Sequence, residues 1–364
     1  MLYFLRGFNR QKDFLLSEIE PQTAFTIVVP FRNEAKNLPT LLRSFSNLKY
    51  PKALFEIILV NDMSEDDSIG VINEFLNSKS GKNLKNIIQI NDRIISTKSP
   101  KKDAITTAIH LAKYDWILTT DADCAVPPYW LDTFDQYIQT NDCVSVSGPV
   151  KFTGLSSFLT RFQILDALSL QAVTLSSFGL QKPMLCNGAN FAYKLSAFKE
   201  VNGFEGNTNS ASGDDMFLLE KFKTSFPKQS HFLKSDKAIV TTLVENSIGD
   251  LMDQRKRWVS KMGASKNGLS KLSGVIVTLM NVLLIALIPL VLFNIIPASS
   301  AGMIVLIKCS VDLLLVFKSA RFFEQEGALL SFVFASLLYP FFNLYVVIAS
   351  LFGTFRWKDR TFSS

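Results

Sequence analysis

Two carboxylates that follow a short apolar run are the clearest chemical feature of the chain. The run from Trp116 to Thr120 is followed by Asp121 and Asp123, one residue apart. Such a run predicts a buried β-strand, and open α/β sheets bind ligands at the carboxyl ends of their strands. Mg²⁺ and Mn²⁺ prefer oxygen ligands and are usually held by one or two carboxylates plus substrate phosphates. The pair therefore suits a divalent cation carrying a diphosphate, although a solvated polar turn has the same residues.

Two further clusters offer acid–base and phosphate chemistry. Asp214 and Asp215 open a predicted helix, where acidic side chains can also serve only as caps that favour the helix dipole. Gln254, Arg257 and Trp258 lie in a helical pattern, at spacings that place them on one face. An amide, a guanidinium and an indole then project together. The alternative is an interfacial tryptophan among basic residues.

Alternating apolar runs and helical patterns predict the elements that position these residues. Strands alternating with helices at this spacing predict an α/β domain, with a mostly parallel sheet and helices on both faces. Phe31, Glu34 and Asp62 follow the first two strands, and Lys102 opens the helix before the strand that precedes Asp121. These ends fit a single polar crevice along one sheet edge. The strands are predicted over 25–30, 55–60, 86–90, 116–120, 143–150 and 238–243, with a glycine-containing strand and turn over 186–193.

The composition sets limits on the class of protein. Of the 364 residues 48% are apolar, and the formal net charge is +6. A nucleic-acid binder would carry a basic stripe with aromatic platforms, whereas the basic residues here are scattered, so we expect no nucleic-acid partner. The positive excess fits anionic lipid headgroups and a phosphorylated substrate. With four widely spaced cysteines and two histidines, we expect neither a zinc site nor a disulfide framework.

The last quarter of the chain holds three long apolar runs, over 275–296, 301–317 and 329–352. They predict an integral membrane protein with about three membrane segments. Lys308 and Asp312 lie four residues apart in the second run and are expected to pair along one helix face. The positive-inside rule places the large N-terminal region in the cytoplasm. Three full spans would leave the basic tail outside, so a re-entrant or interfacial run is an open alternative.

The length allows one large domain or two ordinary ones. The apolar-rich segment over 155–180 is equally consistent with core and with a helix lying on a membrane. The predicted division is an N-terminal segment that can form an interfacial helix, the α/β domain, an amphipathic helix, the transmembrane region and a basic tail, over 1–23, 24–245, 246–272, 273–353 and 354–364.

The ordered motifs are Val29-Pro30-Phe31-Arg32-Asn33-Glu34, Val60-Asn61-Asp62, Lys102, Asp121-Ala122-Asp123, Gly213-Asp214-Asp215 and Gln254-x-x-Arg257-Trp258. This set resembles the family-2 inverting glycosyltransferases, in the membrane-attached branch with the ceramide glucosyltransferase-like enzymes and the cellulose and hyaluronan synthases. The resemblance covers residues 24–260, and the order of the elements together with Q-x-x-R-W makes it specific. It implies a GT-A nucleotide-sugar domain followed by C-terminal transmembrane helices.

The resemblance also implies roles for the nucleotide-binding residues. Phe31 and Glu34 would lie near the nucleoside, and Asp62 would bind the base or ribose. Lys102 would lie near the base or diphosphate. Asp121 and Asp123 would bind the nucleotide-sugar donor, with Asp123 preferred as the ligand of Mg²⁺ or Mn²⁺.

On the acceptor side, Asp215 takes the place of the catalytic base in a single displacement with inversion. Asp214, Gln254, Arg257 and Trp258 would line the acceptor and diphosphate side. The chain departs from the family at three positions. Asp214 stands where Glu is more frequent, which leaves its role open. Asn61 and Met63 replace a frequent Asp and a frequent Gly.

The sequence does not identify the sugar, and it leaves the acceptor open among a lipid, a lipid-linked saccharide and a polysaccharide. About three apolar runs do not suggest a wide polymer channel, so we expect transfer of one sugar to a lipid-type acceptor, with processive polysaccharide synthesis as the alternative. Nucleotidyl transfer would usually require a glycine-rich phosphate loop, which the segment after the first strand lacks. A non-catalytic membrane scaffold is a remoter alternative, because the acidic residues are intact.

Overall fold

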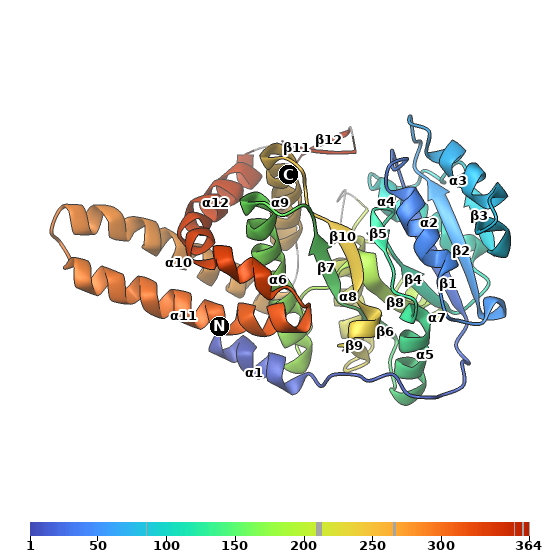
Figure 1. The fold of residues 1–364 in the computed structure, drawn as a ribbon, viewed down its shortest axis with the longest axis horizontal. Coiled ribbons are helices and arrows are strands. Elements are labelled where there is room, and N and C mark those ends of the chain that lie inside the picture. Colours follow the sequence, from blue (N-terminus) through green and yellow to red (C-terminus); the bar gives the residue numbers. More distant parts are fainter. Residues whose placement is uncertain (85, 209–212, 265–266, 353, 359, 364) are drawn as a thin grey trace. The chain divides into compact units, whose positions relative to one another are not determined.

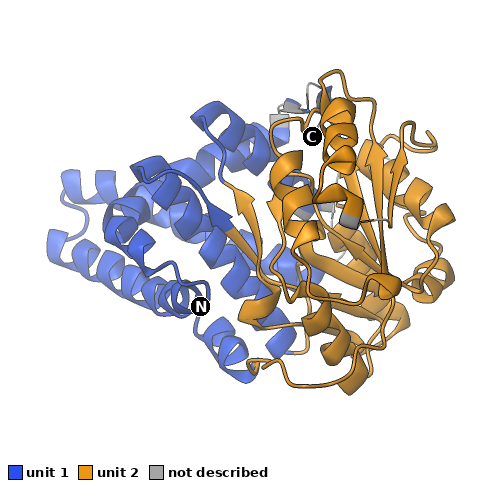
Figure 2. Ribbon diagram, turned by 45° about the vertical axis from the view of Figure 1, so that its right-hand side comes forward, with its two compact units in different colours: residues 1–10, 152–180, 244–364 blue, residues 11–151, 181–243 orange. Residues whose placement is uncertain are grey.

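The computed structural model describes residues 1–84, 86–208, 213–264, 267–352, 354–358 and 360–363. The chain forms two compact units, coloured separately in Figure 2. Unit 1 contains residues 1–10, 152–180 and 244–364, and unit 2 contains residues 11–151 and 181–243. The chain therefore leaves unit 2 and returns to it once before the C-terminal helices begin.

Unit 2 is built on a seven-stranded sheet with the order β3 (Ile87–Ile90), β2 (Phe55–Asn61), β1 (Phe25–Phe31), β4 (Trp116–Thr119), β8 (Phe191–Lys194), β6 (Ser145–Ser147) and β9 (Ser230–Phe232) (Figure 1). The strands from β3 to β4 are parallel to their neighbours, and β6 is parallel to β9. Only β8 runs against its neighbours β4 and β6. The predicted α/β fold with a mostly parallel sheet is confirmed.

The register of the parallel strands brings three loops to the same sheet edge. Phe31 at the end of β1 pairs with Asn61 at the end of β2. On the other side of β1, the Thr120 amide after β4 donates to the Val28 carbonyl. Every residue of β2 is buried, as its apolar sequence predicts for a central strand. The loops after β1, β2 and β4 therefore start side by side.

Helices pack against this sheet, and α4 (Pro100–Leu111) contacts both β1 and β2. Proline begins α4 at the position where the missing N–H costs nothing. The other helices of unit 2 are α2 (Leu38–Ser46), α3 (Ser68–Asn77), α5 (Trp130–Thr140), α7 (Leu195–Glu200) and α8 (Asp214–Ser225), with short 3₁₀ turns η1 (Lys52–Leu54), η2 (Gly81–Asn83), η3 (Gly188–Asn190) and η4 (Asp236–Ala238).

The strand predicted over 143–150 is divided in the structure. It forms β6 and, after Gly148 and Pro149, a separate strand β7 (Val150–Thr153). Proline has no N–H to give to a ladder, which explains the break. A second small sheet pairs β5 (Cys124–Ala125) antiparallel with β10 (Val240–Leu243).

Unit 1 is helical. Its helix α6 (Phe158–Gly179) covers the segment for which core and membrane surface were equally open, and most of its residues are buried inside the protein. Ser157 caps this helix by accepting a hydrogen bond from the Thr160 amide. The structure therefore favours the core alternative. The remaining elements are α1 (Leu2–Arg10), α9 (Ile248–Ala264), α10 (Gly268–Leu292), α11 (Ala298–Phe322), η5 (Glu326–Ser331), α12 (Phe332–Phe352) and the hairpin β11 (Thr354–Trp357) and β12 (Arg360–Ser363).

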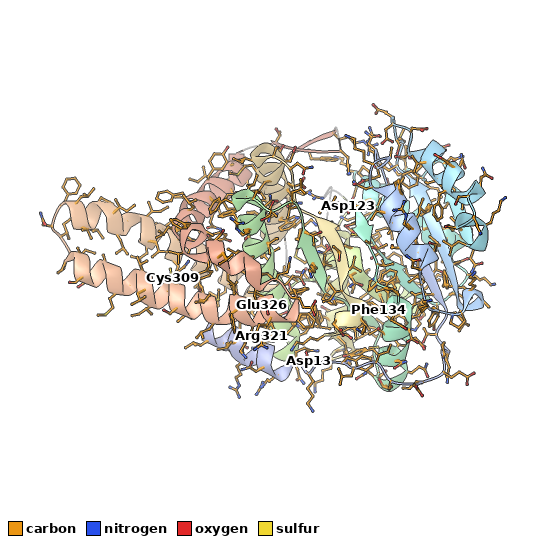
Figure 3. All side chains as sticks on the ribbon, viewed as in Figure 1. Asp13, Asp123, Phe134, Cys309, Arg321 and Glu326 are labelled. Carbon is orange, nitrogen blue, oxygen red and sulfur yellow. The ribbon has the colours of Figure 1, made fainter. Side chains whose placement is uncertain are left out.

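Three helical segments of unit 1 are long and apolar enough to cross a membrane: 268–292, 298–322 and 326–351. They coincide with the three predicted apolar runs. Lys308 and Asp312 form the predicted ion pair on α11, with 3.0 Å between Nζ and Oδ2. Cys309 is labelled beside them in Figure 3.

The predicted N-terminal helix is α1, and it packs on α6. Gly7 and Phe8 are its buried residues. A Cβ atom at Gly7 would overlap the Ser176 carbonyl oxygen of α6 and lie 2.7 Å from Leu180 Cγ. The helices can approach this closely only because residue 7 has no side chain.

We therefore expect Gly7→Val to separate α1 from α6 and to destabilise the protein by roughly 1–3 kcal/mol, as overpacked sites do. The measurement is the midpoint of thermal unfolding in detergent. Gly263→Ala is the matched control, because a Cβ there meets nothing within 4 Å. An unchanged midpoint for Gly7→Val would contradict the packing described here.

Candidate active site

A lysine cation joins two acidic segments at the end of β4. Lys101 Nζ lies 2.7 Å from Asp121 Oδ1 and 3.5 Å from Asp214 Oδ2. Asp121 comes from the loop after β4, Lys101 from the start of α4, and Asp214 from the first turn of α8. The Lys101 side chain is 16% exposed and that of Asp214 is 5% exposed. The two carboxylate pairs singled out in the sequence therefore each place one member at the same cation.

The loop before β8 completes this cluster. The Gly188 amide donates to Asp215 Oδ2 at 3.0 Å, and Thr119 of β4 donates to the Gly188 carbonyl at 2.7 Å. Gly213, which precedes α8, has φ +86°, a conformation that glycine adopts without strain. It turns the chain so that Asp214 and Asp215 both start the helix. Gly188 thus links the end of β4 to the start of α8 through these two hydrogen bonds.

Gly188 leaves little room for a side chain among its charged neighbours. A Cβ atom there would lie 3.0 Å from Asp214 Oδ2, 3.3 Å from Lys101 Nζ and 3.6 Å from Asp215 Cβ. The glycine therefore lets three charged side chains approach one point.

The charges of the cluster fix the protonation state of Lys101. Burial alone would lower the pKa of the ammonium group. The carboxylates of Asp121, Asp214 and Asp215 outweigh burial and hold that pKa above its usual value. Lys101 is therefore a permanent cation, suited to an anionic group such as a diphosphate. The same field acts on Cys124, whose pKa is raised well above the usual thiol value by burial, and then by Asp123 and Asp121.

Asp121 and Asp123 are the residues that could hold a metal ion in this loop, together with oxygens from a substrate. Asp123, labelled in Figure 3, is half-buried in the loop after β4. Among the described residues no group of three His, Cys, Asp or Glu side chains could hold a metal ion. A cation here would therefore have two carboxylates and take its other oxygens from phosphate and water, as Mg²⁺ commonly does. Lys101 already neutralises Asp121, which favours Asp123 as the stronger ligand.

Asp62 lies in a buried chain of charges at the end of β2. Arg93 forms an ion pair with Asp62 Oδ1, and its Nη1 lies 2.9 Å from Asp103 Oδ2. All three side chains are less than 10% exposed. Ser96 also donates to Asp103, at 2.8 Å. Arg93, between β3 and α4, therefore fixes the carboxylate that was predicted to read the base or ribose.

The loops after β1 and β2 are locked to each other. Arg32 bridges to the backbone carbonyl of Asp62 at 3.1 Å and to Glu65 at 2.6 Å. Asn33 and Met63 have φ of +51° and +56°, in the left-handed region. Met63 therefore stands where glycine would fit without strain, which agrees with the frequent glycine of the resembling family.

The other predicted nucleotide-side residues have different surroundings. Phe31 and Glu34 are buried, and Glu34 accepts a hydrogen bond from the Asn37 side chain at 2.7 Å. Lys102, fully buried, donates to the Asn207 carbonyl at 2.6 Å and lies over the Phe217 ring. Its neighbour Lys101 contacts Asp121 and Asp214.

Gln254, Arg257 and Trp258 lie on α9 of unit 1. Gln254 donates to Glu245 Oε1 at 2.7 Å, and the Trp258 ring meets Phe152 edge to face with 6.3 Å between ring centres. All three residues lie within α9, which extends from Ile248 to Ala264, so the helix predicted to place them on one face is present.

Comparison with known proteins decides the family. The profile described as "Glycosyl transferase family 2" matches residues 26–201, and "Glycosyl transferase family group 2" matches residues 116–351. The chain belongs to glycosyl transferase family group 2. The resemblance to the family-2 glycosyltransferases that was drawn from the motifs is confirmed.

Individual relatives of this glycosyltransferase are distant. The poly-β-1,6-N-acetyl-D-glucosamine synthase of Staphylococcus epidermidis is 24% identical over 258 residues, 70% of this chain and 58% of the relative. The Staphylococcus aureus (strain COL) synthase is 25% identical over 271 residues, 70% of this chain and 59% of the relative. The chain thus spans less than two thirds of these synthases.

A solved structure supports the GT-A fold of this glycosyltransferase. The mannosyltransferase of Pyrobaculum calidifontis, in complex with GDP-Man and Mn²⁺, matches with TM-score 0.54 and 14% identity. The match covers 96% of this chain and 94% of that protein.

Three residues of the candidate site were not predicted from the sequence: Lys101 and Gly188 of the cluster, and Arg93 beside Asp62. Lys101 and Lys102 are adjacent at a helix start, and only the packing of α4 on the sheet decides which of them turns to the carboxylates. The glycine in the segment 186–193 was a signal for a close backbone approach.

We expect Lys101→Met to lower turnover by roughly 10²-fold, because it removes a preformed cation from the reacting centre. Lys98→Met, at an exposed lysine of the loop that precedes α4, is the control.

The loss of stability in Lys101→Met should not depend on pH between 6 and 9. A lysine with a raised folded-state pKa contributes fully below the unfolded value of about 10.4 and loses its contribution only above it. Unfolding midpoints of both proteins across this range test the sign. A difference that shrinks towards pH 9 would show that Lys101 loses its proton there.

Proposed function

We propose that the protein transfers a sugar from a nucleotide diphosphate sugar, most simply a UDP-sugar, to a hydroxyl of a lipid or lipid-linked acceptor, with inversion. The observation that carries the proposal is the meeting of Lys101 with Asp121 and Asp214, beside the Gly188–Asp215 contact. One cation and several carboxylates at a strand end suit an anionic diphosphate and its metal.

Asp123, with Asp121, would hold Mg²⁺ or Mn²⁺. When bound, the cation supplies charge neutralisation for the departing diphosphate. The mannosyltransferase with the similar fold was solved with Mn²⁺ and GDP-Man, which supports this part of the proposal. Lys101 contributes a second positive charge to the same leaving group, and Asp62, held by Arg93, orients the nucleoside.

Asp215 is the proposed base. Its carboxylate accepts the proton of the acceptor hydroxyl while that oxygen forms a bond to the anomeric carbon. The bond from the anomeric carbon to the diphosphate oxygen breaks in the same displacement, and the nucleoside diphosphate leaves with the electron pair. The Gly188 amide, which donates to Asp215 Oδ2, favours the ionised carboxylate and fixes its direction.

The acceptor side is assigned to Gln254, Arg257 and Trp258, with Asp214. Arg257 can donate two parallel hydrogen bonds to a phosphate, and the amide and indole suit a sugar or lipid headgroup. The three candidate membrane spans support a membrane-bound acceptor. We assign the catalytic unit to the cytoplasm, where basic flanking residues are retained.

A second candidate is processive polysaccharide synthesis. It is favoured by the relatives, which are named as poly-β-1,6-N-acetyl-D-glucosamine synthases. Their chains are longer than the matched region. Product size separates the two candidates.

The first test supplies membranes carrying the protein with labelled UDP- and GDP-sugars and Mn²⁺ or Mg²⁺. Label in organic-extractable lipid is expected from one donor, and label in high-mass polymer would support the second candidate instead. Asp215→Asn should lower turnover roughly 10²–10⁴-fold, as expected for loss of a general base, with UDP binding retained. Asp236→Asn, an exposed acidic residue of unit 2, is the control. Full activity of Asp215→Asn would exclude Asp215 as the base.

Metal dependence is tested separately. EDTA should abolish turnover, and added Mn²⁺ or Mg²⁺ should restore it. Asp123→Asn should raise the half-saturating metal concentration at least roughly tenfold, because it removes one of only two protein ligands. Turnover that survives EDTA would contradict a metal-assisted departure.

A further inference from the structure

A buried ion pair anchors α9 to α6 within unit 1. Arg255 Nε donates to Asp166 Oδ2 at 2.6 Å, and these side chains are 6% and 5% exposed. The residues are 89 positions apart in sequence. A buried ion pair of this kind contributes little net stability, because desolvation offsets the attraction. Stability alone therefore does not account for the pair, which calls for another role.

Arg255 contacts two of the three acceptor-side residues. Its guanidinium carbon lies 4.1 Å from the centre of the Trp258 ring, in a stacked cation–π contact. Its Nη1 also donates to Gln254 Oε1. The planar guanidinium thus fixes the indole and the amide at the same time, which a lysine ammonium cannot do.

The other end of the Gln254 amide is also held. Its Nε2 donates to Glu245 Oε1 at 2.7 Å. The backbone of Glu245 exchanges two hydrogen bonds with the Gln163 side chain of α6, at 2.9 Å and 3.0 Å. Burial raises the pKa of the Glu245 carboxyl, and the positive charge of Arg257 lowers that pKa by less. Two points on α6, Gln163 and Asp166, therefore set the rotation of α9.

We infer that Asp166 and Arg255 are positioning residues for sugar transfer, which hold Gln254 and Trp258 in the orientation that receives the acceptor. The inference rests on the proposed function, since the acceptor role of those two residues is part of it. Neither Asp166 nor Arg255 needs to touch substrate.

The test compares Arg255→Lys with wild type in full-length detergent-purified protein. Labelled UDP-GlcNAc and Mn²⁺ are supplied with and without extracted host membrane lipids. Two rates are measured, transfer to lipid and hydrolysis by water. We expect the ratio of transfer to hydrolysis to fall between roughly ten- and a hundredfold, as for a displaced substrate-positioning group. A purely structural role would lower both rates equally and leave the ratio unchanged.

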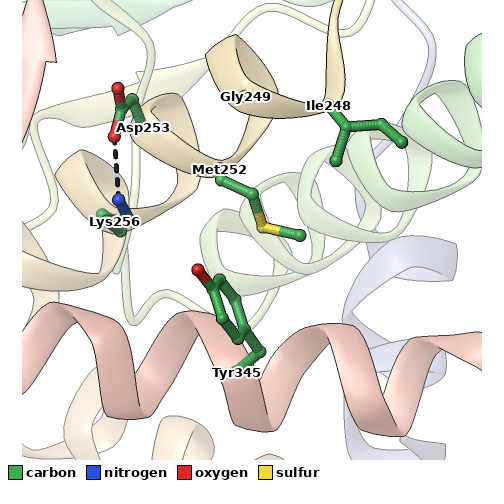
Figure 4. Close-up of a pocket in the computed structure, with 6 residues that line it drawn as sticks. All are labelled: Ile248, Gly249, Met252, Asp253, Lys256 and Tyr345. Carbon is green, nitrogen blue, oxygen red and sulfur yellow. Dashed lines mark hydrogen bonds and ion pairs between the residues drawn. The ribbon is translucent and has the colours of Figure 1, made fainter.

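The control is Lys256→Met on the neighbouring position of α9. Figure 4 shows Lys256 paired with Asp253. Both residues, together with Tyr345 of α12, line an open hollow of about 480 Å³. This variant removes one positive charge from α9, a larger electrostatic change than Arg255→Lys, without touching the stack on Trp258, so its ratio should equal that of wild type.

A spectroscopic readout examines the stack without relying on turnover. The protein contains four tryptophans, so 5-fluorotryptophan labelling gives few resonances, and Trp258→Phe assigns one of them. Arg255→Lys should shift the Trp258 resonance, and Lys256→Met should not. An unshifted resonance, or a shifted one with an unchanged transfer ratio, overturns the inference.

Two further variants keep the outcomes distinct. If Arg255→Lys does not fold, Asp166→Asn combined with Arg255→Gln replaces the charges by a neutral hydrogen-bonded pair, which such sites tolerate. Full transfer by that double variant would overturn the inference. If wild type transfers no sugar, or if Asp215→Asn and Trp258→Phe transfer as well as wild type, the proposed function fails, while the resonance still decides the stacking.

Discussion

The attraction between Lys101 and its carboxylates is the interaction on which the catalytic unit depends. Asp121 and Asp214 are brought to one ammonium group from separate elements. Without that cation, like charges a few ångströms apart would repel by several kcal/mol at the effective dielectric of a protein surface. The cluster therefore requires α4, the end of β4 and the start of α8 to meet, and it requires Gly188 to leave room between them.

The sheet edge supplies a second constraint, because its loops must hold their shape without a bound donor. Arg32, Arg93 and the left-handed residues Asn33 and Met63 fix the two loops after β1 and β2. A left-handed conformation at a residue with a side chain costs of order 1–3 kcal/mol. The surrounding hydrogen bonds to Ser64, Asp66 and Ser68 offset that cost. Contacts within the protein thus hold this edge in one shape.

The sequence was sufficient to predict the parts that depend on local pattern. Apolar runs located the strands, their order implied the common edge, and the motifs led to the family. Long-range packing was not accessible in this way. The choice between Lys101 and Lys102 depends on how α4 rotates against the sheet, and the break between β6 and β7 depends on Pro149. The assignment of residues 152–180 to unit 1 could not be predicted either, because the composition of α6 fits both a core helix and a helix on a membrane surface.

The path of the chain suggests why α6 interrupts unit 2. Its segment begins at Phe152, within β7, and ends at Leu180, eight residues before Gly188. One continuous stretch therefore carries Gln163 and Asp166, which orient α9, and Gly188, which orients Asp215. The proposed acceptor-side residues and the proposed base are therefore both supported from this one stretch of chain. A deletion within this stretch would therefore disturb the contacts of α9 and the contact of Asp215 together. A substitution at Arg255 would disturb only the contacts of α9. Variants of the Arg255–Asp166 pair can therefore separate the proposed positioning of the acceptor from bond formation, which changes in the stretch from α6 to Gly188 cannot do.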